Sequence, residues 1–202
     1  VGLLCAALLN KGKTTLCHMP KIEEVYRLIE VLESINVKVE WKDTDITITP
    51  PKTFNLKNID VDAARKTRSI VMFIGPLVHQ LKKFSLPQSG GCKLGSRTVR
   101  PHFYALENFG VTIDTTEDAF NVAVSPKCPE EIILYESGDT VTENTLFAAA
   151  LAPCVTTIKY ASANYMVQEI CAFLMQCGVK IEGIGTTTLI VTGVATIDQD
   201  VT

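Results

Sequence analysis

The spacing of hydrophobic residues changes along the chain between a helical and a strand pattern. In the stretch 22–35, apolar residues recur at helical spacing, as Val25, Leu28 and Ile29 show, and the stretch 167–177 repeats that spacing. Elsewhere, apolar and polar residues alternate over short stretches, which is typical of a strand with one buried face. These alternating stretches lie at 45–49, 119–124 and 188–192. The pattern predicts an α/β protein.

One helix-to-strand corner occurs three times. In each copy a leucine and a further helical turn precede Asn36, Gly110 or Gly178, and a valine follows directly. Asparagine and glycine are the residues that best tolerate the left-handed conformation at a helix C-cap. Each copy is therefore predicted to be a helix, a cap and a strand. The three copies span 32–39, 106–113 and 174–181.

A second helical pattern and another strand precede each corner. The helical patterns lie at 3–9, 69–81 and 143–151, and the strands that follow them lie at 14–17, 84–86 and 155–158. Each unit thus runs helix, strand, helix, strand, strand. We expect residues 1–202 to form a single domain of three repeats, at about 1–63, 64–127 and 128–202, packed around shared helices. The stretch 50–65 is interpreted as the joint between the first two repeats.

Composition limits the function classes. Of the 202 residues, 47% are hydrophobic and 20% are charged, and the net charge is −3, so the chain is an ordinary globular protein without the basic surplus of a nucleic-acid binder. The longest apolar runs, 1–9 and 146–155, are shorter than the ~18 residues that a membrane helix needs. Because the chain opens at Val1 within a helical pattern, we interpret it as a piece of a longer protein.

The seven cysteines are odd in number, widely spread and without a C-x-x-C pair. This pattern favours reduced thiols in a cytoplasm, several of them in the core, over a disulfide framework or a zinc site. We therefore expect a cytoplasmic protein without a metal site, and we expect no cofactor.

A glycine-rich loop at 87–97 is the stretch with the strongest chemical character. Gly91 and its neighbouring glycines let the backbone lie close to a ligand, while Lys93 and Arg97 supply positive charge for an anion. A cysteine in that field, Cys92, would have a lowered pKa and could serve as a nucleophile or proton donor. The alternative is a mobile surface loop with an incidental thiol, since clusters of glycine and serine usually mark loops.

These residues and several flanking motifs resemble the central signature of the UDP-N-acetylglucosamine 1-carboxyvinyltransferases, which belong to the enolpyruvyl transferases. The matching stretches are 67–70, 75–77, 85–87, 90–92, 94–97, His102, 106–107 and 142–144. The resemblance implies one domain of the family's inside-out α/β barrel, with three βαβαββ-type repeats around inward helices. It also implies a second domain, absent from this chain, with the active site in the cleft between the two.

The resemblance further implies an activity and a set of site residues. The reaction would transfer enolpyruvyl from phosphoenolpyruvate to the 3-hydroxyl of UDP-N-acetylglucosamine in peptidoglycan synthesis. Cys92 would protonate the enolpyruvyl methylene and would be alkylated by fosfomycin-type epoxides. Arg68 and Arg97 would hold the phosphate and carboxylate of phosphoenolpyruvate, with Gly91 and Lys93 beside them. The isolated chain, lacking the residues of the second domain, would be inactive.

Several positions depart from the family pattern around the nucleotide. Arg100 stands where the family has an acidic residue, and the stretch 134–138 lacks an expected lysine. Two alternatives therefore stay open, namely a transferase with a different acceptor and a non-catalytic ligand-binding or structural module. Cys92 disfavours the shikimate-pathway relative. Taken alone, Arg68 could be a surface cation at a helix start, and His102 is expected to be a structural histidine rather than a base.

Overall fold

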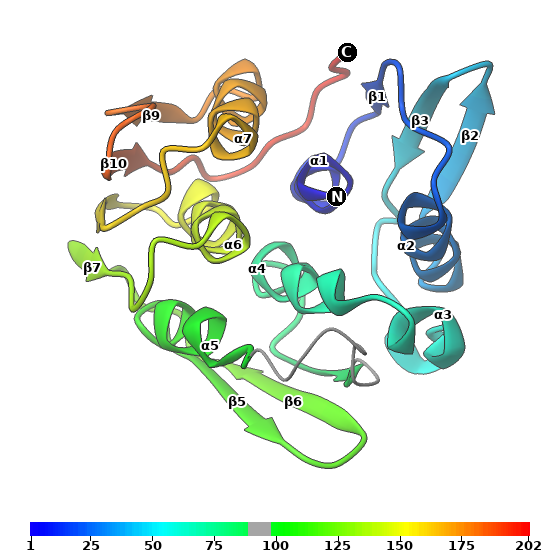
Figure 1. Ribbon diagram of the computed structural model, residues 1–202, viewed down its shortest axis with the longest axis horizontal. Helices are drawn as coiled ribbons and strands as arrows, with labels where there is room; N and C mark the ends of the chain where they lie inside the picture. Colours follow the sequence, from blue (N-terminus) through cyan, green and yellow to red (C-terminus); the bar gives the residue numbers. More distant parts are fainter. Residues whose placement is uncertain (89–97) are drawn as a thin grey trace.

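The computed structural model describes residues 1–88 and 98–202. Within them, three antiparallel-rich sheets surround a bundle of helices (Figure 1). The first sheet has the order β1-β3-β2, the second β4-β6-β5 and the third β7-β8-β10-β9. The strands are β1 (Thr14–Leu16), β2 (Lys38–Lys42), β3 (Asp45–Thr49), β4 (Lys83–Pro87), β5 (Val111–Thr115), β6 (Ala119–Val124), β7 (Glu131–Ile133), β8 (Val155–Lys159), β9 (Lys180–Glu182) and β10 (Thr188–Thr192).

The helices alternate with these strands in the predicted order. The α-helices are α1 (Gly2–Ala6), α2 (Glu23–Ser34), α3 (Val61–Arg65), α4 (Ile74–Leu77), α5 (Arg100–Glu107), α6 (Asp139–Ala150) and α7 (Tyr165–Gln176). The 3-10 helices are η1 (Ala7–Leu9), η2 (Leu56–Asn58) and η3 (Arg68–Phe73). Each unit contains an inner helix, a strand, an outer helix and two further strands. The predicted α/β class, with three repeats around inward helices, is confirmed.

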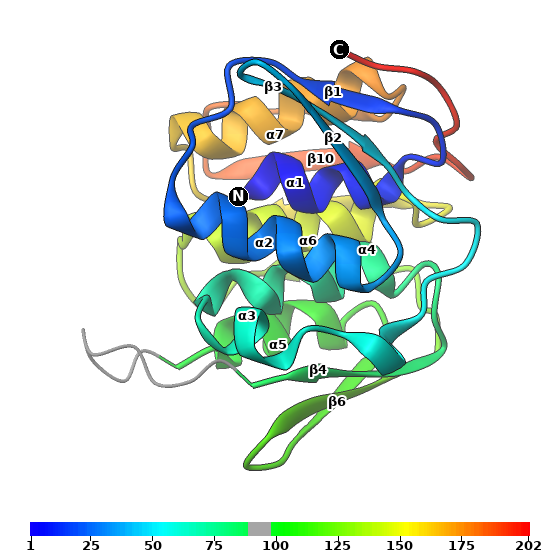
Figure 2. The same ribbon diagram turned by 90° about the vertical axis from the view of Figure 1, so that its right-hand side faces the viewer.

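The inner helices α1, α4 and α6 lie at the centre, and α2, α5 and α7 lie outside them (Figure 1). This placement follows from side-chain character, because α6 is buried around most of its circumference whereas α2 is buried only on the face that carries Val25, Leu28 and Leu32. The side view shows the helices running roughly parallel, with β4 and β6 below them (Figure 2). All three units thereby share one hydrophobic core.

The three corners adopt the predicted conformation. Asn36, Gly110 and Gly178 have φ angles of 69°, 79° and 92°. At the first and third corners the following valine donates its backbone N–H to a carbonyl inside the preceding helix, from Val37 to Leu32 and from Val179 to Leu174. These bonds satisfy carbonyls that the helix end would leave unpaired.

The helix predicted at 69–81 is divided into η3 and α4. The side chain of Asn144, from α6, bonds to both pieces at their junction: it accepts a hydrogen bond from Gly75 N and donates one to the Val71 carbonyl. In a continuous α-helix these two backbone groups would bond each other. An inserted side chain is a recognised cause of such a break.

The joint at 50–65 contains more structure than expected. It includes η2 and the short helix α3, whose N-cap Asp60 accepts a hydrogen bond from Ala63 N at 2.9 Å. An aspartate that bonds the free N–H groups of a first turn stabilises even a short helix. The third sheet also has a strand beyond the repeat, because β7 pairs in parallel with β8.

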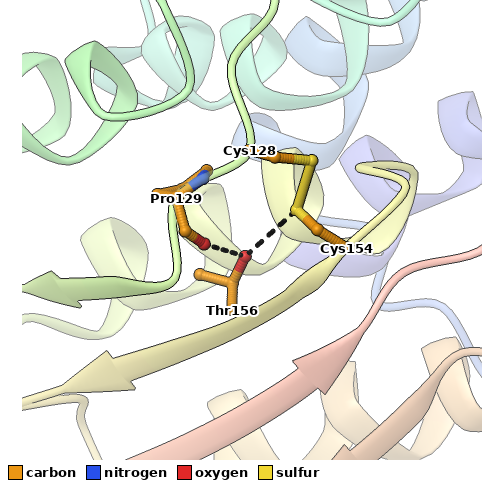
Figure 3. Close-up of a disulfide and its surroundings, with 4 residues drawn as sticks. All are labelled: Cys128, Pro129, Cys154 and Thr156. Atoms are coloured by element: carbon orange, nitrogen blue, oxygen red, sulfur yellow. Dashed lines mark hydrogen bonds between the residues drawn. A yellow bond between two sulfur atoms is a disulfide. The ribbon is translucent and has the colours of Figure 1, made fainter.

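Two cysteines form a disulfide, so the expectation of reduced thiols throughout was wrong. Cys128 and Cys154 are bonded across a separation of 26 residues (Figure 3). Next to them, Thr156 Oγ1 donates to the Pro129 carbonyl at 2.9 Å. The cysteines lie just before β7 and β8, and the parallel pairing of these strands brings the two thiols together. Spacing alone did not reveal this proximity.

The last described segment returns to the first unit. The backbone of Val201 bonds on both sides with the start of β1, since Thr15 N donates to the Val201 carbonyl and Val201 N donates to the Lys13 carbonyl. Asn10 Nδ2 donates to the Gln199 carbonyl at 2.7 Å. The third unit is thus joined to the first.

In residues 1–88 and 98–202, no helix has the length and apolar character to cross a membrane.

Candidate functional site

A pocket of about 480 Å³ opens where η3, α5 and α6 meet. Its residues come from three segments that the sequence separates widely. They are Arg68, Ser69, Val71 and Met72 from η3, Thr98, Val99 and His102 at and before α5, and Glu136 and Thr140 around the start of α6. Thr98, which lines this pocket, directly follows residues 89–97 in the sequence.

Arg68 is the one predicted site residue that the structure describes. It is the first residue of η3, and it is half-buried in the pocket wall. The side chain of Thr67 caps this helix by accepting a hydrogen bond from Ser69 N at 3.2 Å. Arg68 is therefore at a helix start, as the simpler interpretation held, but it also lines the pocket. The remaining predicted site residues, Gly91, Cys92, Lys93 and Arg97, lie outside the described residues.

His102 is buried at the base of the pocket, with 6% of its surface exposed. Its Nδ1 lies 3.1 Å from Asn144 Nδ2, and its Nε2 lies 3.4 Å from Thr140 Oγ1. Burial, and to a smaller extent the nearby charge of Arg68, lower the pKa of His102 to about 4. The ring is therefore neutral at pH 7.

The start of α6 is held by a second hydrogen-bonded cluster. Asp139 accepts hydrogen bonds from Ser162 Oγ and, at 2.8 Å, from Asn164 Nδ2. Thr142 Oγ1 accepts from Ser162 N at 3.0 Å. These bonds fix the first turn of α6 and with it Thr140, which lines the pocket.

Sequence reasoning missed Glu136 and Thr140 as pocket residues. Glu136 is exposed and brings a carboxylate to the same pocket as Arg68. Its stretch attracted notice only for lacking a lysine. The motif 142–144 was noted, but nothing in it showed that Asn144 reaches His102.

Within the described part of the chain, no group of three His, Cys, Asp or Glu residues is arranged to hold a metal ion.

Comparison with known proteins relates the sequence and the fold to a family. The family model described as EPSP synthase (3-phosphoshikimate 1-carboxyvinyltransferase) matches residues 2–202. The chain belongs to this family. The three repeats around inward helices are therefore those of an enolpyruvyl transferase domain, and the fold that the sequence predicted is confirmed.

Curated relatives narrow the resemblance within the EPSP synthase family. The UDP-N-acetylglucosamine 1-carboxyvinyltransferase of Bradyrhizobium diazoefficiens is 32% identical over 197 residues, which are 98% of this chain and 46% of that enzyme. The enzyme of the same name from Coprothermobacter proteolyticus is 34% identical, over 96% of this chain and 45% of the enzyme. The predicted resemblance is confirmed. The chain spans about half the length of these relatives.

Solved structures of the family have the same fold. The enolpyruvyl transferase NikO from Streptomyces tendae superposes with a TM-score of 0.84 at 16% identity, over 99% of this chain and 48% of that one. An EPSP synthase from Acinetobacter baumannii gives a TM-score of 0.71 at 15% identity, over 98% and 46%. At these identities the likeness concerns the fold alone.

Proposed function

We propose that this chain is one half of an enzyme that transfers enolpyruvyl from phosphoenolpyruvate to the 3-hydroxyl of UDP-N-acetylglucosamine, in peptidoglycan precursor synthesis. The observation that carries the proposal is the similarity of nearly the whole chain to enzymes with that name. The pocket supports it, because Arg68 provides a cation next to the point where the Cys92 loop rejoins the described chain.

The reaction assigns a role to each predicted residue. The sugar hydroxyl would give its proton to a general base and add to C2 of phosphoenolpyruvate while Cys92 delivers a proton to C3. Loss of phosphate from C2 together with a proton from C3 would then restore the double bond. Arg68 and Arg97 would bind the phosphate and carboxylate, for which the planar guanidinium is well suited. Gly91 and Lys93 would lie beside the substrate. A second domain would complete the site, so the 202 residues alone would not turn over.

A different acceptor is the second candidate, and Glu136 favours it. Its carboxylate lines the pocket and repels the like charge of a nucleoside diphosphate, although solvent exposure weakens this effect. An acceptor with less negative charge, or with a hydroxyl or ammonium group directed to Glu136, would fit this pocket better. Cys92 and Arg68 would keep the same roles in that reaction.

Labelling by fosfomycin tests the proposal in the longest natural protein that contains these residues. The burial of each described thiol indicates in advance which cysteines can react with the epoxide. Burial raises the pKa of Cys5 to about 12 and the pKa values of Cys171 and Cys177 to about 11, so these thiols are unreactive at neutral pH. Among the described cysteines outside the disulfide, Cys17 is exposed.

We expect one adduct, at Cys92, that forms faster with UDP-N-acetylglucosamine present. Cys92→Ser should abolish the adduct, whereas the matched variant Cys17→Ser should leave it unchanged, as measured by intact mass and peptide mapping. Phosphate release from phosphoenolpyruvate, measured over a panel of acceptor alcohols, then separates the two candidates. The proposal would be contradicted if the protein showed no labelling and no phosphate release under conditions in which the Bradyrhizobium diazoefficiens enzyme shows both. That result would favour a non-catalytic module.

A further inference from the structure

The side chain of Asn144 lies at the meeting point of η3, α4 and α5. It projects from α6, and only 1% of the residue is exposed. It makes three hydrogen bonds: from Gly75 N to Oδ1 at 2.9 Å, from Nδ2 to the Val71 carbonyl at 3.2 Å, and between Nδ2 and His102 Nδ1 at 3.1 Å. All the hydrogen-bonding groups of this amide except one oxygen lone pair are used.

Two backbone groups fix which way round the amide lies. A backbone N–H can only donate, so the atom that faces Gly75 N must be the oxygen. A backbone carbonyl can only accept, so the atom that faces Val71 O must be the nitrogen. The orientation of this side chain therefore follows from chemistry.

The orientation of the amide determines the tautomer of His102. One hydrogen of Nδ2 goes to the Val71 carbonyl, and the other is directed to His102 Nδ1. Nδ1 must accept that hydrogen, so in the neutral ring the proton resides on Nε2. Nε2 lies on the side of Thr140, a pocket residue, at a distance of 3.4 Å from its hydroxyl oxygen.

The surroundings of the His102 ring keep it uncharged. Arg68, from η3, disfavours an added proton on His102. Glu136, from the segment before α6, lines the same pocket but is exposed to solvent, which weakens its influence. Burial, the larger cause, also disfavours the charged ring, and burial and Arg68 together lower the pKa of His102 to about 4. The ring is therefore neutral at pH 7, and its Nε2–H faces the Thr140 hydroxyl oxygen at 3.4 Å, a long contact that a substrate oxygen could replace.

We propose that Asn144 is a positioning residue that locks His102 as the Nε2–H tautomer, so that the ring presents a fixed, uncharged donor to an oxygen of the bound acceptor substrate. The identity of that substrate rests on the proposed function, whereas the tautomer does not. A neutral donor held in place hydrogen-bonds a carbonyl or phosphate oxygen at no cost of reorganisation. It also contributes no charge that would change with pH in the neutral range.

The tautomer can be measured by nitrogen-15 NMR of histidine side chains in the 202-residue chain. With three histidines, His102→Gln assigns the signal. His79 is an internal reference, since its Nε2 lies 3.0 Å from the Phe147 carbonyl and must donate. We expect both rings to show the Nε2–H pattern at pH 7. An Nδ1–H pattern for His102, or a mixture of the two patterns, would overturn the proposal. This test needs no variant other than the one used for the assignment.

Asn144→Asp then tests the cause. An ionised aspartate can still accept from Gly75 N, but it offers no hydrogen to Nδ1, so at a pH where the new carboxyl is ionised the proton of His102 should move to Nδ1. The pKa of His102 should rise from about 4 toward its ordinary value of 6.5, while the His79 pattern stays unchanged. If His102 retains its Nε2–H pattern in a folded Asn144→Asp chain, Asn144 does not set the tautomer.

Titration of the longest natural protein that contains these residues with UDP-N-acetylglucosamine separates this inference from the proposed function. Binding should shift the His102 Nε2–H signal, and His102→Gln should weaken binding about tenfold, the loss of one hydrogen bond. Binding that moves other signals but leaves Nε2–H in place would overturn the donor role. If no signal responds to the sugar nucleotide, the proposed function fails, and the tautomer measurement still decides the role of Asn144.

Discussion

Glu143 and Asn144 are adjacent on α6 and both are buried, and the Asn144 amide hydrogen-bonds to residues of three other elements. Glu143 has 4% of its surface exposed, and burial raises the pKa of its carboxyl to about 7. Asp139 and Glu169 add to this shift by repulsion. A carboxyl with a raised pKa stabilises the fold below pH 4.5, where it is protonated in both states, and loses that contribution as the pH rises through 7.

Replacing Glu143 by glutamine should therefore stabilise the protein at pH 8 and leave it unchanged at pH 4. The expected gain at pH 8 is on the order of 3 kcal/mol, from the difference between the ordinary pKa and the raised one. The measurement is denaturant unfolding at both values. The burial of His102 produces the opposite slope, a loss of stability as the pH falls from 6.5 to 4, so each variant is compared with the wild type at the same pH.

Glu33→Gln is the matched control, because Glu33 is exposed on α2. Its pH profile should coincide with that of the wild type. If Glu143→Gln gives the same profile as Glu33→Gln, Glu143 does not carry the raised pKa.

At the scale of elements, the three left-handed corners are equivalent in conformation but differ in their surroundings. A Cβ at Gly178 would have no neighbour within 4 Å, whereas a Cβ at Gly110 would collide with the Ser125 carbonyl. Asn36 shows that this conformation accepts an asparagine in the first corner. The space around each corner, rather than its φ angle, should then determine what residue it tolerates.

Two single substitutions test this difference. Gly178→Asn should change the free energy of unfolding by no more than about 1 kcal/mol, since asparagine tolerates the left-handed region. Gly110→Asn should cost about 1–3 kcal/mol more, because the backbone of residue 125 must move. Denaturant unfolding of the two variants, each serving as the other's control, measures the difference. Equal costs would mean that the collision at Gly110 is relieved by movement of the chain.

The corners were predictable because their cause is local: Asn36, Gly110 and Gly178 each end a helix by their own conformational preference. The break between η3 and α4 could not be predicted, because it depends on Asn144, a residue of another unit. The site residues divide in the same way between those that the sequence indicates and those that only the fold brings together. Arg68 was found through motifs, whereas the link between His102 and Asn144 exists only after folding brings α5 and α6 together.

For the whole molecule, the disulfide is the largest difference between the prediction and the structure. Cys128 and Cys154 hold the starts of β7 and β8 together across 26 residues (Figure 3). Sequence spacing could not pair them, since seven cysteines allow many pairings. The bond restricts the unfolded chain, and a loop of this length is expected to stabilise the fold by about 3 kcal/mol.

Reduction should therefore lower the stability of the protein, and Cys154→Ala should lower it as much. Thermal unfolding with and without a dithiol reductant measures the first effect, and reductant should have no further effect on Cys154→Ala. Cys17→Ser, which removes an exposed thiol, should unfold like the wild type. Intact mass under non-reducing conditions should show two hydrogen atoms fewer than the reduced chain. A mass equal to that of the reduced chain would contradict the bond.

The return of the last segment to β1 has a consequence for how the molecule melts. Val201 lies beside β1 in parallel, as β7 lies beside β8, so the third unit supplies a neighbour to the first. Units in an open row can fray from either end, as in solenoid proteins. Units joined in a circle have no end, and each loses two neighbours when it opens. Melting of this protein should thus be shared by all three repeats.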